Sequence, residues 1–530
     1  MPKKSNSAII REMPDPRAST ISQTPHRVAM FAAIRRDPLV WSVVLLLALI
    51  YFAVGARYDI FRNELYFIVC GRHPAFGYAD LPPLVPLIAA ATQIYGVNTW
   101  LLRLPAILAT LALIPLTAEF ARTLGGGRAS ASMAAIAVAI APMLLGLGST
   151  LGTGTFEPLG WTLCAYLLAR AIVRGERDAA LWAGIVAGAS FQAKYGIAIW
   201  LIGVAIGISA TSARRILSWG QLWYGMAAAV VIGAPSLVWQ HIHGWPFLAA
   251  IRYATVHRNL TGTPLRFEIQ QTLAMNLLMA PLWITGVVAP AFVEKLKPVR
   301  FLSIAFIVTT AIIIGTHGKG YYLAPAYPTM FAVGSVACSE LSVWLTAPWF
   351  AAASALTIPI LPVVLPIFDP PELAHYLDKS LLRPRPVEVE GIGAPLTQIF
   401  SDEVGWRTME KQVANVYRAL PAEDRAKAAI MTQNYGEAAA LDVYGHADNL
   451  PPALCGQLQY YFWGTHGYDG SVIIQVNGDP NHWSSICRES RAVGSFGAPY
   501  TMPYENGPII LCRGLRRPLP EIWDLFKRFR

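Results

Sequence analysis

Several acids and one arginine lie close together near residue 60. If residues 59–70 form a short helix, Asp59 and Tyr66 share one face with the residues at the i+3 and i+4 positions between them, and Glu64 lies on another face. A partly desolvated carboxylate has a raised pKa and can serve as a general base, whereas a solvated cluster of ion pairs has no catalytic role. The candidate residues of this stretch are Asp59, Arg62, Asn63, Glu64, Tyr66 and Asp80.

Four later segments place ionisable or aromatic residues at the ends of apolar blocks. A lysine at such an end can neutralise a phosphate as a point charge, and a carboxylate there is a candidate functional group. Charged residues that anchor helix ends and tyrosines of an interfacial aromatic belt are the structural alternatives. The residues concerned are Glu157, Lys194, Tyr195, His257, Arg258, Lys319, Tyr321 and Tyr322.

Long apolar blocks must position these residues. The chain of 530 residues is 54% hydrophobic and only 14% charged, whereas globular proteins average about 25% charged residues. Many blocks approach the roughly 20 residues that cross a bilayer, which predicts a polytopic α-helical membrane protein of about 11 spans. The candidate spans are 38–56, 104–122, 129–147, 156–173, 179–193, 195–210, 221–239, 272–293, 301–316, 322–340 and 344–366.

The segment 82–95 decides the topology. It is apolar but short and begins with Pro82 and Pro83, which favours an interfacial or re-entrant piece over a span. In that case the basic connections between spans share one side, and the positive-inside rule makes that side the cytoplasm. We therefore expect a cytoplasmic basic tail over 1–37, whereas all the candidate residues above and everything after residue 367 lie outside. The formal net charge of +10 is thus explained by topology, and nucleic acid is not an expected partner.

A change in composition follows the last span. Prolines mark 367–395 as a linker, and 396–530 reads as a soluble α/β or α+β domain on the exterior, with a helix over 402–420 and strands at 428–432, 471–476 and 508–512. This domain holds Cys455, Cys487 and Cys512, whose spacing fits no zinc site. An oxidising exterior allows one disulfide, for which we predict Cys487–Cys512.

Six short motifs, in their order and spacing, resemble glycosyltransferase family 39. This bacterial group is related to protein O-mannosyltransferases and to sugar transferases that act on lipid A. The resemblance covers about 38–340, and the tail around 434–438 is similar to the exterior domain of one subgroup. The motifs are Arg62-Asn-Glu-Leu-Tyr-Phe67, Tyr78-Ala-Asp-Leu-Pro-Pro83, Arg103-Leu-Pro105, Thr155-Phe-Glu157, Lys194-Tyr195 and Gly318-Lys-Gly-Tyr-Tyr322.

The resemblance implies a type C glycosyltransferase fold with its catalytic outer loop at 56–103. It also implies a polyprenyl-phosphate sugar as donor and catalysis on the outer face of the bacterial inner membrane. Members usually carry an Asp-Glu pair in this loop, and its Asp is the favoured base. Here Asn63 stands in that place, and an amide cannot accept a proton. We therefore expect Glu64 to be the base, with Asp59 as the second choice.

The expected reaction is an inverting sugar transfer to a lipid, glycan or protein hydroxyl. Glu64 would activate that hydroxyl, and Arg62, Lys194 and Lys319 would stabilise the leaving lipid phosphate. Asp80 and Glu157 would shape the sugar site. The remaining expected substrate-binding residues are Tyr66, Tyr195, His257, Arg258, Tyr321 and Tyr322.

Two other functions stay open on the sequence. A transporter or flippase of a lipid-linked substrate would more naturally place its ionisable residues near the middle of the membrane. A non-catalytic relative that binds a lipid-linked sugar is suggested by Asn63. No cofactor is indicated, since there is no GxxxxGK[ST] loop; a divalent metal is compatible with the sequence, but no ligand set stands out. The exterior domain could bind the acceptor or cap the active-site loops.

Overall fold

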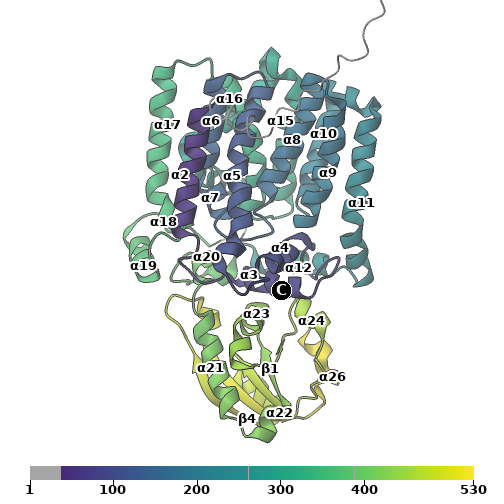
Figure 1. The fold of residues 1–530 in the computed structure, drawn as a ribbon, viewed down its shortest axis with the longest axis vertical. Coiled ribbons are helices and arrows are strands. Elements are labelled where there is room, and N and C mark those ends of the chain that lie inside the picture. The colour runs from purple at the N-terminus through teal and green to yellow at the C-terminus, as the bar shows by residue number, and fades with distance from the viewer. Residues whose placement is uncertain (1–36, 261, 387, 530) are drawn as a thin grey trace, which may run out of the picture.

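A helical bundle and a smaller C-terminal domain make up the molecule (Figure 1). The computed structural model describes residues 37–260, 262–386 and 388–529. The predicted cytoplasmic tail of 1–37 therefore lies outside the described residues, apart from Asp37. The first described helix begins at the end of the bundle that lies away from the C-terminal domain (Figure 1). The chain therefore enters the bundle at one end and leaves it at the other.

The bundle helices stand side by side, and several pairs approach closely because they meet at glycines. A Cβ on Gly184 would lie 2.1 Å from the carbonyl oxygen of Gly225, and one on Gly334 would lie 2.0 Å from that of Leu282. Small residues that let helix backbones touch are typical of membrane bundles. The main helices are α2 (Pro38–Val54), α5 (Thr99–Thr123), α6 (Arg128–Ala139), α7 (Pro142–Leu147), α8 (Glu157–Arg174), α9 (Arg177–Ala193), α10 (Ile197–Ala210), α11 (Gly220–Ile242), α14 (Ala280–Phe292), α15 (Arg300–Gly315), α16 (Tyr327–Cys338) and α17 (Val343–Thr357).

Apolar length identifies the bundle as membrane-spanning. Among the described residues, four helical stretches are long and apolar enough to cross a membrane, and up to six are if each of two bent pairs counts as one span. The four are Thr99–Thr123, Gly220–Ile242, Glu294–Gly315 and Val343–Val364. Each of the 11 predicted spans contains a helix, but several are short or broken, so the number 11 stays a prediction.

A layer of short helices lies between the bundle and the C-terminal domain (Figure 1). It contains α3 (Arg62–Arg72), α4 (Leu84–Thr92) and α12 (Pro246–Tyr253). Helix α4 has nine residues, fewer than half of the roughly 20 that cross a bilayer. This agrees with the interpretation of 82–95 as a segment that does not span.

The C-terminal domain is built on a five-stranded mixed sheet in the order β2-β1-β3-β5-β4. Strands β1 (Ala428–Thr432), β3 (Val472–Val476) and β5 (Gly507–Leu515) confirm the three predicted strands, whereas β2 (Ala453–Leu454) and β4 (Cys487–Phe496) were not predicted. Helix α21 (Trp406–Ala419) falls within the predicted helix, and α23 (Tyr435–Tyr444) faces the bundle (Figure 1).

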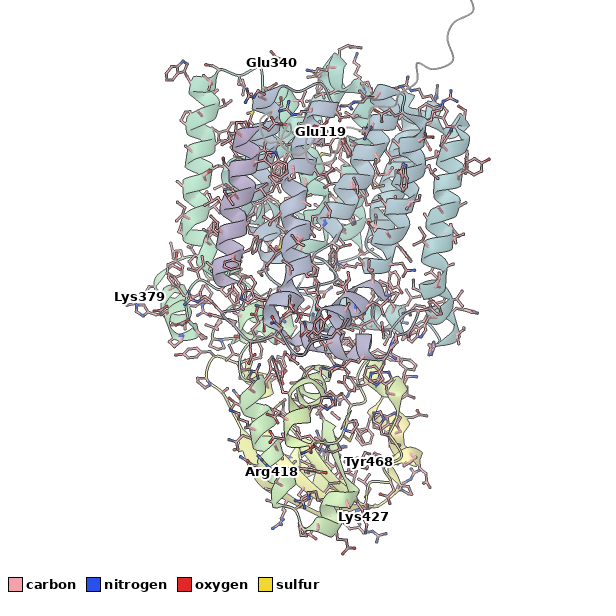
Figure 2. All side chains as sticks on the ribbon, in the orientation of Figure 1. Glu119, Glu340, Lys379, Arg418, Lys427 and Tyr468 are labelled. Carbon is pink, nitrogen blue, oxygen red and sulfur yellow. A yellow bond between two sulfur atoms is a disulfide. The ribbon has the colours of Figure 1, made fainter. Side chains whose placement is uncertain are left out.

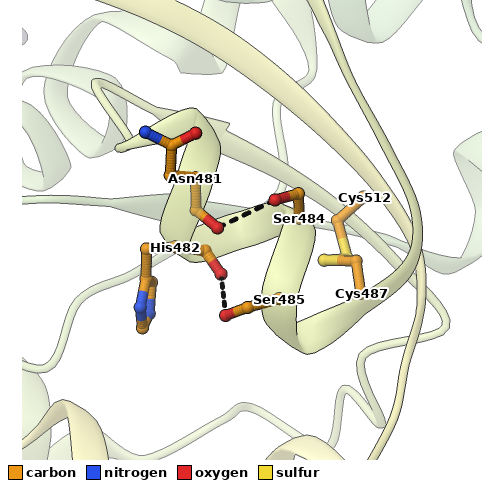
Figure 3. The surroundings of a disulfide bond; sticks show 6 residues. All are labelled: Asn481, His482, Ser484, Ser485, Cys487 and Cys512. Carbon is orange, nitrogen blue, oxygen red and sulfur yellow. Dashed lines mark hydrogen bonds between the residues drawn. A yellow bond between two sulfur atoms is a disulfide. The ribbon is translucent and has the colours of Figure 1, made fainter.

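A disulfide joins Cys487 to Cys512, as predicted. Figure 3 shows that the short helix α25 (Pro480–Ile486) ends directly before Cys487. The bond links the edge strand β4 to β5 next to it. The other four cysteines are buried and free.

The segment predicted as a linker contains helix α19 (Pro370–Lys379). Its prolines sit at the first helical positions, where a missing N–H costs nothing, and Asp369 with Glu372 forms a capping box. Leu373 and Leu377 are buried in a cluster with Tyr58 and Phe400. Helix α19 therefore packs against Tyr58 of the first loop and is not an extended connection between two domains.

The positive-inside rule assigns the two ends of the molecule to opposite sides of the membrane. We expect a membrane-impermeant maleimide to label Lys427→Cys in intact cells, because Lys427 lies at the tip of the C-terminal domain (Figure 2). The matched variant Glu340→Cys lies at the opposite end of the bundle (Figure 2), so it should be labelled only after permeabilisation. The reverse pattern would overturn the orientation.

Candidate active site

Helix α3 begins at Arg62, three residues later than the predicted start at 59. The backbone N–H of Phe61 donates to Glu64 Oε2 at 2.9 Å, which closes the first turn as a capping box. One face of α3 then turns toward the C-terminal domain, where Arg62, Asn63 and Tyr66 all contact Tyr435. Glu64 lies on another face, as predicted.

Arg103 of α5 holds Glu64 inside the protein. Its Nη2 lies 3.0 Å from Glu64 Oε2 and 3.0 Å from Glu403 Oε2. Nη2 also donates to the carbonyl oxygen of Asp59, and Nη1 donates to that of Gly55. Leu151 donates its backbone N–H to Glu64 Oε1 at 2.7 Å. The side chains of Arg103 and Glu64 are both fully buried, so the Glu64 carboxylate has no surface left for an acceptor hydroxyl.

Asp59 lies at the domain boundary and not beside the other candidate residues. Its Oδ1 accepts hydrogen bonds from Arg407 Nε at 3.2 Å and from Tyr444 Oη at 3.1 Å, both in the C-terminal domain. The carboxylate of Asp59 thus joins the two domains.

Arg62 is buried between aromatic rings. Its guanidinium lies 5.4 Å from the ring centre of Tyr435 and 5.9 Å from that of Tyr504, and it forms an ion pair with Asp402 at 3.5 Å. Burial raises the pKa of Asp402 to about 6, although Arg62 opposes this rise. The C-terminal domain thus supplies every one of these partners.

Asp80 is a carboxylate that keeps some exposure. It is half-buried, and Tyr66 Oη donates to its Oδ1 at 2.9 Å. Burial raises its pKa to about 6, against the lowering effects of the Tyr66 hydrogen bond and of the Arg258 charge. A carboxylate with a pKa near neutrality and one oxygen held in place is suited to accept a proton.

Lys194 and the loop around residue 320 bring cations to the same end of the bundle. Lys194 Nζ lies 2.7 Å from Glu157 Oε2, 5.3 Å from the ring centre of Tyr321 and 4.7 Å from that of Tyr322. Lys194 is half-buried, so its ammonium is paired on one side without being sealed off.

Glu388 draws two further cations together. Its carboxylate pairs with Lys319, and Arg258 Nη2 lies 2.8 Å from Oε2. Burial would raise its pKa, but Lys319 and Arg258 prevail and lower it to about 2. Arg258 Nε also lies 2.8 Å from Glu390 Oε1, so Glu388 and Glu390 together balance the charges of Lys319 and Arg258.

Most of the predicted residues form one continuous cluster. The charge of Arg258 acts on Asp80, Asp402 and Tyr435 alike. The Tyr195 ring packs next to Lys194, 4.8 Å from the ring centre of Phe191 and 4.6 Å from that of Phe247. His257 is exposed, with its ring 4.8 Å from that of Tyr253, and lies apart. The residues of the cluster that were not predicted from the sequence as site residues are Arg103, Glu388, Asp402, Glu403, Tyr435 and Tyr504.

Comparison with known proteins identifies the architecture. Residues 80–239 match the family model of dolichyl-phosphate-mannose-protein mannosyltransferases. The solved structure of ArnT from Cupriavidus metallidurans in the apo state superposes with a TM-score of 0.56 at 14% identity, covering 92% of this chain and 98% of ArnT. The chain has the type C glycosyltransferase fold.

Two further structures agree with this result. ArnT from Cupriavidus metallidurans bound to undecaprenyl phosphate matches with a TM-score of 0.54 at 13% identity, over 89% of this chain and 97% of ArnT. The mycobacterial arabinofuranosyltransferase AftD matches with a TM-score of 0.52 at 15% identity, over 90% of this chain but 40% of AftD. No curated protein sequence matches the chain. The resemblance stated from the sequence motifs is confirmed.

Within the described residues, no group of three or more His, Cys, Asp or Glu side chains is placed to hold a metal ion.

The Arg103 network should dominate the stability of the junction between the domains. Arg103→Leu leaves the carboxylates of Glu64 and Glu403 buried without their shared cation, and breaking a buried ion pair costs about 3–5 kcal/mol. Thermal unfolding in detergent should show a large loss of stability. The control Arg407→Leu removes an exposed pair with Asp59, which is worth at most about 1 kcal/mol. Equal stability of the two variants would contradict this role.

Proposed function

We propose that the protein is a membrane glycosyltransferase that moves a sugar from a polyprenyl-phosphate donor to an acceptor hydroxyl. The observation that carries this proposal is the gathering of a half-exposed carboxylate and several cations at one end of a type C bundle. Asp80 is the carboxylate, and Lys194 and Arg258 are the cations that we propose for the phosphate. A cation that neutralises the leaving phosphate lowers the barrier most in such a partly dry site.

The cations suit a lipid phosphate that gains charge during the reaction. In the donor the phosphate is a diester with one negative charge, and departure of the sugar leaves a monoester with up to two. Lys194 stands next to the loop glycine Gly154, where a Cβ would lie 3.7 Å from Nζ. A compact ammonium in this position can follow a phosphate as a point charge.

We propose Asp80 as the general base, in place of Glu64, which we expected from the sequence. A general base must reach the proton that it abstracts, and the fully buried Glu64 carboxylate is surrounded by Arg103, Phe61 and Leu151. In the proposed step the acceptor oxygen bonds to the anomeric carbon of the sugar as the bond from that carbon to the phosphate oxygen breaks. The acceptor proton passes to Asp80 and the electron pair stays on the polyprenyl phosphate.

Asn63 does not deprive this site of a base. Its amide accepts a hydrogen bond from Tyr435, and Asp80 provides a carboxylate one segment further along the chain. This favours an enzyme over a non-catalytic relative. A transporter is disfavoured because the ionisable residues gather at one end of the bundle and not at its middle.

We place the reaction on the outer face of the bacterial inner membrane. The bundle over 38–366 would be the transferase domain, and 396–530 would lie in the periplasm, where the Cys487–Cys512 bond is stable. The acceptor is a lipid, glycan or protein that carries a hydroxyl.

Transfer of radiolabelled sugar from undecaprenyl-phosphate donors tests the proposal. Asp80→Asn should lower kcat/KM by about 10²- to 10⁴-fold, the usual contribution of a general base, while thermal stability and donor binding are retained. In the unmodified protein kcat/KM should rise with pH through about 6, because Asp80, whose pKa is raised to about 6, must lose its proton to act.

The variant Tyr66→Phe separates Asp80 from other acids of similar pKa. The Tyr66 hydroxyl lowers the pKa of Asp80, so removing it in Tyr66→Phe should move the midpoint of the pH profile upward. Asp402, whose pKa is also raised to about 6, has no hydrogen bond to Tyr66. A midpoint that stays in place, or full activity of Asp80→Asn, would remove Asp80 from this role.

A further inference from the structure

The first turn of α23 reaches across the domain boundary into the transferase site. Tyr435 Oη donates to Asn63 Oδ1 at 2.7 Å, although 372 positions separate the two residues. The Tyr435 ring lies 4.9 Å from the ring of Tyr66, whose hydroxyl holds Asp80. The C-terminal domain thus places a phenol two contacts away from the proposed base.

The backbone around Tyr435 is held firmly. Asn434 caps α23 by accepting from the N–H groups of Gly436 and Glu437 at 2.9 and 3.0 Å, and the N–H of Tyr435 donates to Gln457 Oε1 at 2.8 Å. Gly436 lies so close to Arg62 that a Cβ there would meet Arg62 Cγ at 2.5 Å. The position of the phenol is therefore set before any ligand arrives, which is what selective binding requires.

Asn63 and Tyr435 together keep unused hydrogen-bonding capacity. An asparagine amide carries an acceptor oxygen and two N–H donors, and Tyr435 uses the oxygen. Among the described residues no partner of the Asn63 Nδ2 group is found, and the residue is half-buried. Burial raises the pKa of Tyr435 to about 12, so its hydroxyl stays protonated and its oxygen can still accept.

This pair has the chemistry of a sugar subsite. A sugar hydroxyl both donates and accepts, and here it meets neutral N–H donors beside a phenol oxygen. The buried rings of Tyr435 and Tyr66 pack against each other beside this pair. A phosphate group suits this pair less well, because Asn63 and Tyr435 carry no net charge. The neighbouring Arg62 already forms an ion pair with Asp402.

We propose that Asn63 and Tyr435 bind a hydroxyl of the sugar that the donor carries, so that the C-terminal domain helps to select the sugar. This inference rests on the proposed transferase function and adds a residue of the C-terminal domain to its site. It also gives Asn63 a role of its own, since an aspartate there would offer the sugar no N–H.

The test uses the full-length protein in nanodiscs. A panel of undecaprenyl-phosphate-linked hexoses, pentoses and uronic acids first finds a sugar that is transferred, and monodeoxy analogues of that donor follow. We expect one analogue to lose about tenfold or more in kcat/KM, because a site built for a hydroxyl rejects a donor that lacks it. Tyr435→Phe should lose about tenfold with the parent donor and should no longer distinguish it from that analogue.

Two further variants complete the test. Asn63→Asp keeps the acceptor for Tyr435 but removes both N–H donors, so it should also lose discrimination against the same analogue. Tyr468→Phe, remote from the junction in the same domain (Figure 2), should behave as the unmodified protein does.

The outcomes separate the two proposals. Transfer by the unmodified protein with discrimination unchanged in Tyr435→Phe, or lowered activity equal for all donors, would overturn the sugar subsite alone. A higher rate in Asn63→Asp would also overturn it, because position 63 would then be that of a weakened base. No transfer from any donor by the unmodified protein would overturn the transferase function and this inference together.

Discussion

One buried guanidinium holds the two parts of this protein together. Arg103 lies in an apolar helix and gathers Glu64 of the first loop, Glu403 of the C-terminal domain and two backbone carbonyls. A buried charge is costly unless it is paired and hydrogen-bonded, and here every partner depends on the others. The loop, the bundle end and the C-terminal domain therefore have one compatible arrangement, and the position of each residue in the site follows from it.

That arrangement divides the acids of the first loop between two tasks. The carboxylates of Glu64 and Asp59 contact arginines and join the domains, whereas Asp80 is partly exposed beside the cations. The same division explains why Asn63 is tolerated. Its side chain is fixed by Tyr435 at the boundary, and in the proposed mechanism Asp80 supplies the charge that proton transfer needs. A type C bundle with a domain docked on it can thus form one site from both.

Local signals in the sequence were sufficient for the bundle and for much of the candidate site. Apolar run length marked the helices, and the placement of basic connections brought Lys194, Arg258 and Lys319 to one end. The strands β1, β3 and β5 are apolar and were found, whereas β4 is a charged edge strand without alternation and was missed. The C-terminal partners Glu403 of Arg103 and Asp402 of Arg62 lie 300 or more positions away, and spacing cannot reveal such contacts. The burial of Glu64 by Arg103, which leads us to propose Asp80 as the base, is likewise a tertiary contact that spacing does not show.

The most direct test of the central claim is an experimental structure of the protein in complex with undecaprenyl phosphate. The account predicts that the phosphate contacts Lys194 or Arg258 within hydrogen-bonding distance, with the Asp80 carboxylate facing the adjoining sugar position and Glu64 still enclosed by Arg103. A phosphate bound away from these cations, or a Glu64 carboxylate released from Arg103 and turned toward the ligand, would contradict it.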